Sequence, residues 1–507
     1  MARGLSRRSF FAAGAALSSG VISVPKAMAA VSSPVHDAAF WREKRPNILF
    51  LLADDWSWTG ANMHDDLMLK VPTYRRLCAE GVRFSNAFVA CPSCSASRAS
   101  ILTGQWPWEL EDGANLAGTL DSRFQVYPEL LEHSGYFVGM TRKGWAPGQL
   151  APGHRTQNPA GQSYVDFAAF LKQRPDGAPF CFWFGSHDPH RPYEIDRGVK
   201  SGIDPSAMKV PPYLPDAPEV RGDMADYAFG VERFNREAGE LIAQLDAIGE
   251  LENTFIVMTG DNGWPFPRGK ASLYDSGIHV PFVVRWGGIE EPGRTVDAII
   301  STTDLAPTFL TLAGVAIPHD MVGVSLLPWL DKEGKLPERD YTLAGMERHM
   351  DVRQTIGWGY PMRALRTKDF LYIRNFEPSR MPAGVPSVHP QTRESFTNNV
   401  YAGYGDIDQG RAKAYITTHQ NDPAVRPFFD RATALRPAQE LYRITDDPYD
   451  MKNLAFDPAF KTVLNKMDAQ LTAELKASHD PRIEGHGALF DHYPTYNDPG
   501  FKRPDVI

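Results

Sequence analysis

The stretch 46–53 has the sequence PNILFLLA, an unbroken apolar run that leads directly into Asp54 and Asp55. Such a run is typical of a strand buried on both faces, as in a parallel sheet covered by helices. Further strands are predicted over 82–89, 135–141, 180–185 and 254–259, and helices over 71–80 and 232–249. Because strands and helices alternate, we predict an α/β fold with a mostly parallel central sheet and helices on both faces.

Side chains that can do chemistry follow the ends of these strands. In sheets of this kind, ligands bind beyond the carboxyl ends of the strands. The candidates at or just after predicted strand ends are Asp54, Asp55, Cys94, Lys143, His187, His190, Asp261 and Asn262. The sequence therefore predicts one site, built at this edge of the sheet.

The character of the chain changes at about residue 340. Residues 360–378 and 440–444 have the pattern of short strands, and residues 460–478 have the pattern of a helix. These elements predict a smaller α+β domain with an antiparallel sheet. The expected division is a catalytic domain over 45–345, a C-terminal subdomain over 346–480 and a surface tail over 481–507.

Residues 1–29 have the features of an export signal. Arg3, Arg7 and Arg8 precede an apolar stretch over 10–24, and small residues near 27–29 offer a cleavage site. The sequence SRRSFF at 6–11 resembles the twin-arginine signal of bacteria. We expect a periplasmic or secreted protein that uses the twin-arginine export machinery. A membrane anchor is the alternative, but the apolar stretch is short for a bilayer span.

Composition limits the class of protein. Of 507 residues, 43% are hydrophobic and 22% are charged, which is typical of a globular protein with a sizeable core. Four cysteines in this length do not make a disulfide scaffold. The formal net charge of −8 argues against a nucleic-acid partner. An anionic substrate would require a local cationic pocket against this overall field.

Cys94 opens the run CSASRASILTG, residues 94–104, which has helical character. The thiol therefore lies near a helix N-terminus, where free backbone N–H groups favour an anion. Arg98 follows one turn later on the same helix face and adds a fixed, forked cation. This arrangement suits a tetrahedral oxyanion. The alternative is a capped helix with a buried thiol.

The two acidic pairs point to a metal ion. Asp54 and Asp55, together with Asp261 and Asn262, offer three carboxylates and one amide oxygen. Such hard oxygen donors suit Ca²⁺ or Mg²⁺ better than zinc. Each pair alone also fits a helix cap or an Asp-Asn-Gly turn. Taken with the Cys94 run, they predict one divalent cation, with Ca²⁺ as the first choice and Mg²⁺ as the alternative.

Over roughly residues 45–476, these motifs resemble the sulfatase family of the alkaline-phosphatase-like superfamily. The run at 94–104 is similar to the family signature Cys-x-Pro/Ala-x-Arg with a later Thr-Gly, in which the cysteine is oxidised to formylglycine. Residues 52–55 and 259–263 resemble its two metal pairs, and 440–455 its C-terminal signature. The resemblance implies that residue 94 contacts the cation. It also implies a maturation partner, either formylglycine-generating enzyme or anaerobic sulfatase-maturating enzyme.

The resemblance implies a mechanism as well. Hydrated formylglycine at position 94 would attack sulfur with one oxygen, and its second hydroxyl would lose a proton so that sulfate is expelled and the aldehyde returns. Lys143 and Lys270 match sulfate-clamping lysines. His190 matches a histidine that protonates the leaving group. Zinc bound by His187 and His190 is disfavoured, because no further ligand lies at matching spacing.

One position departs from the family pattern. The family has a histidine two residues after the first clamping lysine, where this chain has Trp145. That histidine normally helps to take the proton from the hydrated aldehyde. Its role would pass to another base, such as His190, or to solvent.

A narrower resemblance is to the heparan N-sulfatase branch, whose substrate is the N-sulfate of a terminal glucosamine. Residues 187–191, 262–274 and 359–364 carry it. It implies a sulfated saccharide substrate. The further candidates for substrate binding are His187, Arg268, Glu347, Arg348 and His349, although a polar surface loop would explain the last three equally well.

The sequence thus predicts a metal-dependent hydrolase of sulfate esters or sulfamates. Two alternatives stay open. The first is a phosphonate monoester or phosphodiester hydrolase of the same superfamily, which can share the formylglycine site. The second is an inactive saccharide-binding relative in which Cys94 is never oxidised.

Overall fold

The structure is a computed structural model that describes residue 40 and residues 43–58, 69–289, 291–331, 339–386 and 403–496. The predicted export signal and the last part of the predicted tail lie outside these residues. Within the described part of the chain, none of the helices combines the length and the apolar character that a membrane crossing requires.

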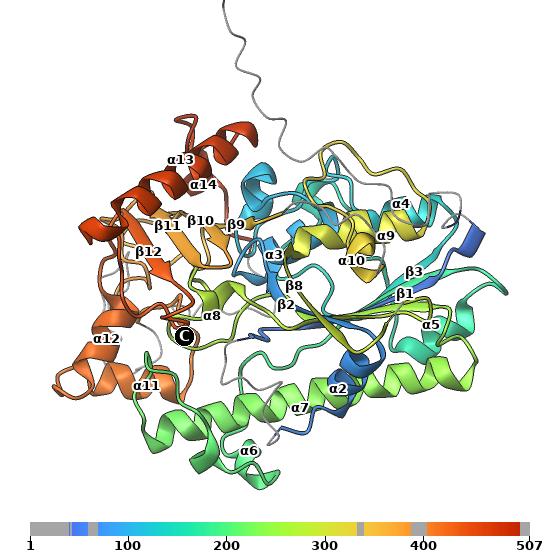
Figure 1. The fold of residues 1–507 in the computed structure, drawn as a ribbon, viewed down its shortest axis with the longest axis horizontal. Coiled ribbons are helices and arrows are strands. Elements are labelled where there is room, and N and C mark those ends of the chain that lie inside the picture. The colour runs from blue at the N-terminus through green and yellow to red at the C-terminus, as the bar shows by residue number, and fades with distance from the viewer. Residues whose placement is uncertain are drawn as a thin grey trace, which may run out of the picture. The chain divides into compact units, whose positions relative to one another are not determined.

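A central sheet of eight strands organises the larger part of the fold, in the order β4-β3-β5-β1-β6-β7-β2-β8 (Figure 1). Its strands are β1 (Asn47–Ala53), β2 (Val82–Phe88), β3 (Phe137–Arg142), β4 (Gln162–Ser163), β5 (Phe180–Gly185), β6 (Thr254–Gly260), β7 (Phe282–Arg285) and β8 (Arg294–Ser301). Strand β1 is parallel to both of its neighbours, β5 and β6, whereas β7 is antiparallel to β6 and β2. The sheet is therefore mostly parallel, which confirms the predicted fold class.

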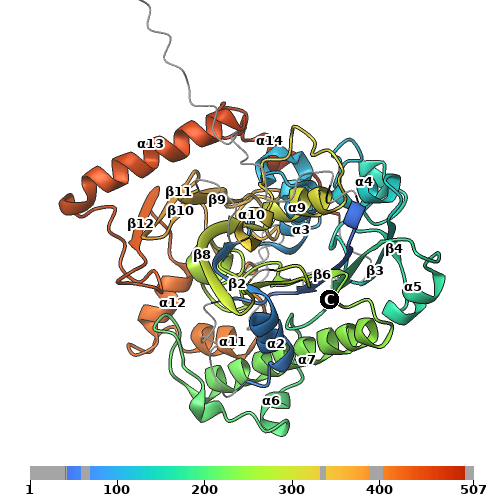
Figure 2. The same ribbon diagram turned by 45° about the vertical axis from the view of Figure 1, so that its right-hand side comes forward.

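The apolar run of β1 is buried at every position. Ile48, Phe50 and Leu52 belong to one hydrophobic cluster, whereas Leu49 and Leu51 belong to another on the opposite face. Successive side chains of a strand point to opposite faces, so a strand between two helical layers needs an apolar residue at each position. Figure 2 shows these layers, with α2 and α7 on one side of the sheet and α3, α4 and α9 on the other.

The helices of the central part flank this sheet. They are α2 (Pro72–Glu80), α3 (Cys94–Thr103), α4 (Tyr127–His133), α5 (Phe167–Gln173), α6 (Arg197–Lys200), α7 (Pro218–Ala247), α8 (Asp275–Ile278), α9 (Leu305–Leu312) and α10 (Leu327–Leu330). Short 3₁₀ helices lie in the connections: η1 (Pro107–Glu109), η2 (Glu111–Ala114), η3 (Ala151–Gly153), η4 (Pro205–Ala207), η5 (Thr302–Asp304) and η6 (Pro458–Phe460).

Helix α7 begins fourteen residues before the predicted start of 232. Its first half contains Asp223 and Asp226, two buried carboxylates that interrupt the apolar pattern. Asp223 pairs with Arg191 at 2.8 Å, and Asp226 pairs with Arg411 at 2.7 Å. The polar residues therefore have partners from distant segments, which a local pattern does not reveal.

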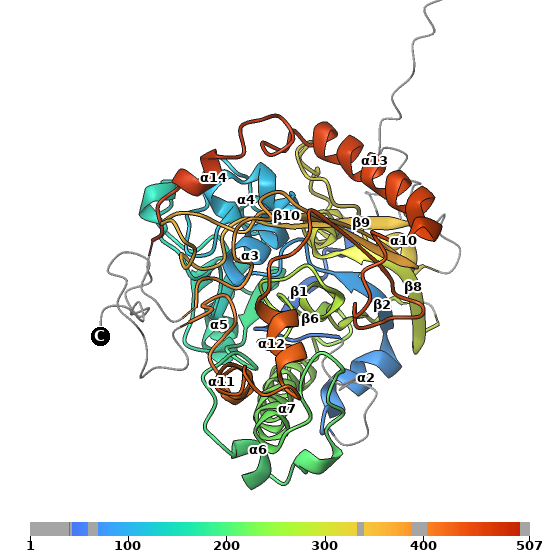
Figure 3. The same ribbon diagram turned by 90° about the vertical axis from the view of Figure 1, so that its left-hand side faces the viewer.

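A second sheet is antiparallel and has the order β12-β11-β10-β9. Its strands are β9 (Tyr341–Met346), β10 (Met362–Thr367), β11 (Phe370–Asn375) and β12 (Gln439–Arg443), and the remaining helices are α11 (Arg411–Thr418), α12 (Arg426–Thr433), α13 (Lys461–Ala477) and α14 (Leu489–His492). Helix α13 lies along this sheet (Figure 3) and buries Leu464, Met467 and Leu471 in the cluster that holds Leu365 and Leu441. The antiparallel sheet and its helix agree with the predicted α+β character of this region.

Strand β9 of the small sheet crosses the predicted domain boundary at 345/346. Its Gly345 N–H donates a hydrogen bond of 2.9 Å to the carbonyl oxygen of Ala90, directly before the Cys94 segment. The described start of the predicted tail packs inward, because Phe490 in α14 is buried. The division of the chain into domains stays a prediction.

Candidate active site

Two acidic pairs and Cys94 meet at the carboxyl edge of the central sheet. Strands β1 and β6 pair in register with Ala53 opposite Gly260, so the residues that follow them lie at the same height. The backbone N–H of Asp55 donates to Asp261 Oδ1 at 2.9 Å. Asp55 has a φ of 74°, a left-handed conformation that Asp adopts more readily than most residues. The sharp turn after β1 thus binds the turn after β6.

Cys94 lies at the first position of α3, after Ser93 as the N-cap residue. Its Sγ atom is 4.0 Å from Asp55 Oδ1, and the side chain is buried. Burial raises the pKa of the thiol to about 12, although Lys143 and Lys270 oppose this shift. An unconverted thiol in this environment carries its proton at neutral pH and is a weak nucleophile.

The donor set fits a hard divalent cation. Potential ligand atoms of Asp54, Cys94 and Asp261 lie within 4.8 Å of one another, and so do those of Asp55, Cys94 and His190. Within the described part of the chain, the buried Oδ1 atom of Asn262 has no hydrogen-bond partner. An unsatisfied buried carbonyl oxygen is costly unless it has a further ligand. This orphaned oxygen beside three carboxylates is the arrangement that Ca²⁺ or Mg²⁺ prefers.

Three cations balance the three carboxylates. Lys143 Nζ is 2.7 Å from Asp54 Oδ2, and Lys270 Nζ is 2.9 Å from Asp55 Oδ1. Burial lowers the pKa of Lys143, but Asp54, Cys94 and Asp261 together outweigh this effect and the net shift is upward. For Lys270, burial is outweighed by Asp408 and then by Asp55, so its pKa is also raised. Both lysines are therefore charged at neutral pH.

Arg98 contacts one carboxylate of each acidic pair. Its Nε donates to Asp261 Oδ2 at 2.8 Å, and an Nη atom lies 3.4 Å from Asp54 Oδ1. The other Nη donates to the carbonyl oxygens of Lys143 and Gly144 at 2.6 and 2.8 Å. The guanidinium is fully buried. These contacts make Arg98 a residue that positions the carboxylates and the Lys143 loop.

Two histidines follow β5. His190 Nε2 is 3.9 Å from Asp55 Oδ2, and its Nδ1 faces the carbonyl oxygen of Arg191. About a third of the His190 side chain is exposed. The ring therefore contacts Asp55 and is also accessible to solvent. His187 is exposed, and partial desolvation of its ring lowers its pKa. His190 thus lies against Asp55, a candidate metal ligand, whereas His187 is exposed to solvent.

The other predicted substrate residues divide into two groups. His349 is buried beside the residue that precedes Cys94, with Nδ1 2.9 Å from Ser93 Oγ. Glu347 instead forms buried ion pairs with Arg363 at 2.7 Å and Arg482 at 2.6 Å. The structure therefore brings His349 to the site and gives Glu347 structural partners.

Arg348 and Arg268 also make contacts within the fold. Arg348 donates to the carbonyl oxygens of Gly357 and Tyr493 at 3.0 and 2.9 Å. Arg268 lies over the ring of Tyr274, 3.7 Å from its centroid, and donates to a backbone oxygen. A substrate role for Glu347, Arg348 and Arg268 stays a prediction without support from their positions.

Trp145, which stands where the family pattern has a histidine, is a core residue. Its side chain is buried in the hydrophobic cluster on one face of the sheet. Its backbone N–H donates to Asn158 Oδ1 at 3.0 Å. The indole therefore packs in the core and offers no base to the site.

Asp408 is a neighbour of the site that sequence reasoning missed. Its Oδ2 lies 3.4 Å from Lys270 Nζ. It belongs to the segment before α11, far from every motif in the sequence. No local signal marks it, because an isolated Asp in a loop has many uses.

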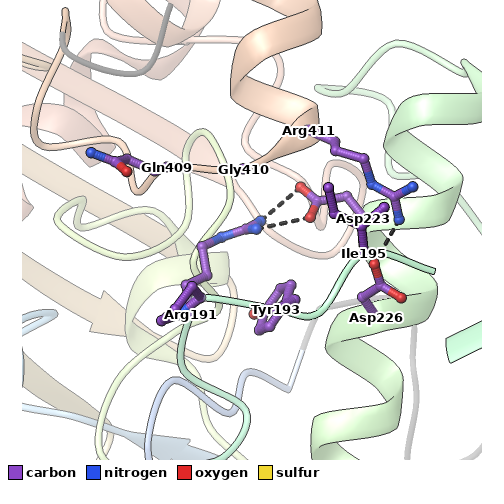
Figure 4. Close-up of a pocket in the computed structure, with 9 residues that line it drawn as sticks. Arg191, Tyr193, Ile195, Asp223, Asp226, Gln409, Gly410 and Arg411 are labelled. Carbon is purple, nitrogen blue, oxygen red and sulfur yellow. Dashed lines mark hydrogen bonds and ion pairs between the residues drawn. The ribbon is translucent and has the colours of Figure 1, made fainter. Parts of the chain in front are cut away.

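A pocket opens beside this segment (Figure 4). It has a volume of about 150 Å³ and is lined by Arg191, Pro192, Tyr193, Ile195, Asp223, Asp226, Gln409, Gly410 and Arg411. Its arginines are paired: Arg191 contacts both oxygens of Asp223 at 2.8 Å, and Arg411 contacts Asp226 at 2.7 Å. The arginines and aspartates that line this pocket therefore form ion pairs with one another.

Comparisons with known proteins agree with this site. A family model described as Sulfatase matches residues 46–315, and one described as N-sulphoglucosamine sulphohydrolase, C-terminal, matches residues 260–373. The chain belongs to the sulfatase family, a family of sulfate ester hydrolases. The predicted family and enzyme class are thereby confirmed.

Individual relatives are distant but cover most of the chain. An ulvan-active sulfatase of Formosa agariphila is 28% identical over 86% of this chain and 81% of its own length. The N-sulphoglucosamine sulphohydrolase of Homo sapiens is 27% identical over 87% of this chain and 92% of its own. The solved structure of BT4656 in complex with its substrate D-glucosamine-2-N,6-O-disulfate has a TM-score of 0.60 at 21% identity, covering 86% of this chain and 98% of that one.

Proposed function

We propose that this protein is a formylglycine- and divalent-metal-dependent sulfatase that acts on saccharides. The substrate class that we propose is N-sulfated glucosamine. The observation that carries the proposal is the convergence of Cys94, two acidic pairs and two charged lysines at one edge of the sheet. The family relationship supports the reaction class. The C-terminal family match and the relatives that act on sulfated glucosamine or ulvan support the saccharide.

The cation would be held by Asp54, Asp55, Asp261 and Asn262, with residue 94 as a further ligand. When bound, it supplies positive charge for an oxygen of the substrate's sulfate group. Conversion of Cys94 to formylglycine supplies a hydrated aldehyde as the oxygen nucleophile. The raised thiol pKa is consistent with a requirement for this conversion, since the thiol itself is held protonated.

Lys143 and Lys270 would bind the sulfate oxygens. Each lysine is buried and charged, and each contacts a carboxylate that also faces the cation. Charge spreads over the equatorial oxygens of the sulfate in the transition state, so two fixed ammonium groups lower its energy. Arg98 would act through them, by holding Asp261 and the Lys143 loop in place.

His190 would protonate the leaving group. Its Nδ1–H would donate to the Arg191 carbonyl oxygen, an assignment made from the hydrogen-bond geometry. The Nε2 atom then carries the mobile proton and faces the site. An amine or alkoxide that leaves sulfur needs a proton at this point, and a histidine can donate one near neutral pH.

We further propose that residues 1–29 direct the folded protein to the twin-arginine export machinery and hence to the periplasm or the outside of the cell. Export after folding allows a maturation enzyme in the cytoplasm to convert Cys94 first. Formylglycine-generating enzyme and the anaerobic maturating enzyme are the two candidates.

The test is substrate profiling of protein made in a host that supplies a maturation enzyme. Mass analysis of the peptide around residue 94 reports conversion, and sulfate release is measured for glucosamine carrying sulfate on nitrogen, O3 or O6. Ulvan oligosaccharides and matched aryl sulfate and aryl phosphodiester substrates complete the panel. A phosphodiester preference would defeat the sulfatase assignment, and an unmodified thiol in protein from the natural host would favour an inactive saccharide-binding relative.

A further inference from the structure

Asp408 presents a carboxylate to the site without being a ligand or a clamp. Its Oδ2 lies 3.4 Å from Lys270 Nζ, and a fifth of the side chain is exposed. Within the described residues, this buried Oδ2 atom has no hydrogen-bond partner. A carboxylate oxygen that is buried beside a reaction site and accepts no hydrogen bond has unused acceptor capacity.

The backbone around Asp408 is held by its neighbours. Asp406 forms a buried ion pair with Arg353 and accepts a hydrogen bond of 2.9 Å from the Met350 N–H. Lys413 Nζ donates to the Ile407 carbonyl oxygen at 2.7 Å. These contacts therefore hold the backbone directly before Asp408, as expected of a segment that carries a preorganised binding group.

The charges around Asp408 keep it ionised. Burial alone would raise the pKa of its carboxyl, but Lys270, His190 and His349 outweigh burial and lower the pKa below its usual value. In turn, Asp408 is the strongest influence that raises the pKa of Lys270. The carboxylate therefore lies beside Lys270, which is proposed to bind sulfate, and within coulombic reach of His190, which is proposed to protonate the leaving atom.

In the proposed placement of the substrate, its bridging atom lies between these two side chains. The bridging atom joins the sulfate, held by Lys270, to the leaving group, which His190 protonates. A carboxylate repels sulfate oxygens and the lone pairs of a bridging ester oxygen, but it accepts a hydrogen bond from an N–H. A sulfamate carries an N–H at this atom, whereas a sulfate ester carries none.

We propose that Asp408 is a specificity-determining residue that accepts a hydrogen bond from the bridging N–H of a sulfamate and so favours N-sulfates over O-sulfates. The proposal rests on the proposed function, because it places the substrate by Lys270 and His190. Asp408 lies in the segment 403–410, beyond both family-model matches.

The experiment compares Asp408→Asn and Asp408→Ala with the unaltered protein on N-sulfoglucosamine and on glucosamine 6-O-sulfate. We expect kcat/KM for the N-sulfate to fall about 10- to 100-fold, the usual effect of losing one charge-assisted hydrogen bond. The value for the O-sulfate should stay within about twofold or rise, since a repulsive charge is removed. Gln409→Ala is the matched control: its exposed side chain points away from the Arg191–Asp223 pair in Figure 4, and neither substrate should respond.

An equal fall for both substrates, or no fall for the N-sulfate, overturns the proposal. If the Asp408 variants do not fold, the unaltered enzyme provides the test through an N-methylated N-sulfoglucosamine, which lacks the N–H. We expect this analogue to lose at least tenfold in kcat/KM, and equal turnover refutes the role of Asp408. Unaltered protein that releases no sulfate from any substrate refutes the proposed function itself, whereas activity on O-sulfates alone refutes only the present inference.

Discussion

Truncation of Arg98 to alanine should destabilise the fold through the site itself. Arg98 is fully buried and contacts Asp261 at 2.8 Å and Asp54 at 3.4 Å. Its loss leaves three buried carboxylates with two cations, and it leaves the carbonyl oxygens of Lys143 and Gly144 without this donor. Removing one partner of a buried ion pair costs about 3–5 kcal/mol, because the remaining charge is uncompensated.

The assay is urea denaturation in the presence of a chelator, so that metal binding contributes to neither protein. Arg76→Ala is the matched control, because Arg76 pairs with Glu80 at 2.8 Å on the exposed face of α2. Such an exposed i,i+4 pair contributes about 0.2–0.5 kcal/mol. We expect a clearly lower urea midpoint for Arg98→Ala and an almost unchanged midpoint for Arg76→Ala.

Arg98→Lys separates charge from geometry. A lysine keeps the positive charge but lacks the planar fork that reaches two carboxylates and two carbonyl oxygens at once. Its midpoint should lie between those of the unaltered protein and Arg98→Ala. Equal midpoints for Arg98→Ala and Arg76→Ala would refute the reasoning, because the buried network would then contribute no more than a surface pair.

Three further predictions concern the nucleophile, the metal and pH. Cys94→Ala should abolish sulfate release while the protein still unfolds cooperatively, because Cys94 is the first residue of α3 and belongs to none of the hydrophobic clusters; loss of the cooperative transition would contradict this. Asp261→Ala should weaken metal binding, measured by calorimetry, and lower the activity together with it. Activity that survives both the substitution and a chelator would show that the reaction does not need the cation. Burial raises the pKa of Glu109 to about 8 from an ordinary 4.5, so its contribution to stability is complete below pH 4.5 and is lost as pH rises to 8. Glu109→Gln should therefore gain thermal stability relative to the unaltered protein at pH 8–9 but not at pH 4, and a difference in Tm that does not change with pH speaks against it.

The sheet could be predicted well because its strands are buried on both faces. Strand β1 shows this most clearly, since its six residues after Asn47 pack alternately into two clusters on opposite faces. The start of α7 could not be predicted in the same way. Asp223 and Asp226 break its apolar pattern, and their partners Arg191 and Arg411 come from other segments.

Much of the candidate site was also predictable, because a strand's end is a local feature. Asp54 and Asp261 follow two strands that prove to be neighbours in register, so the structure brings them together beside Cys94. Glu347 illustrates the limit. Its sequence position suggested a sugar contact, whereas its carboxylate forms ion pairs with Arg363 and Arg482.

The sequence by itself determined the fold class, the family and the kinds of side chain at the strand ends, because hydrophobic periodicity and a contiguous signature are written in adjacent residues. Only the tertiary structure decided which charges meet: Lys143 with Asp54, Lys270 with Asp55, and Asp408 beside Lys270. These partners lie 89, 215 and more than a hundred residues apart along the chain. Coulombic and hydrogen-bond energies depend on distance in space, which a local pattern does not contain.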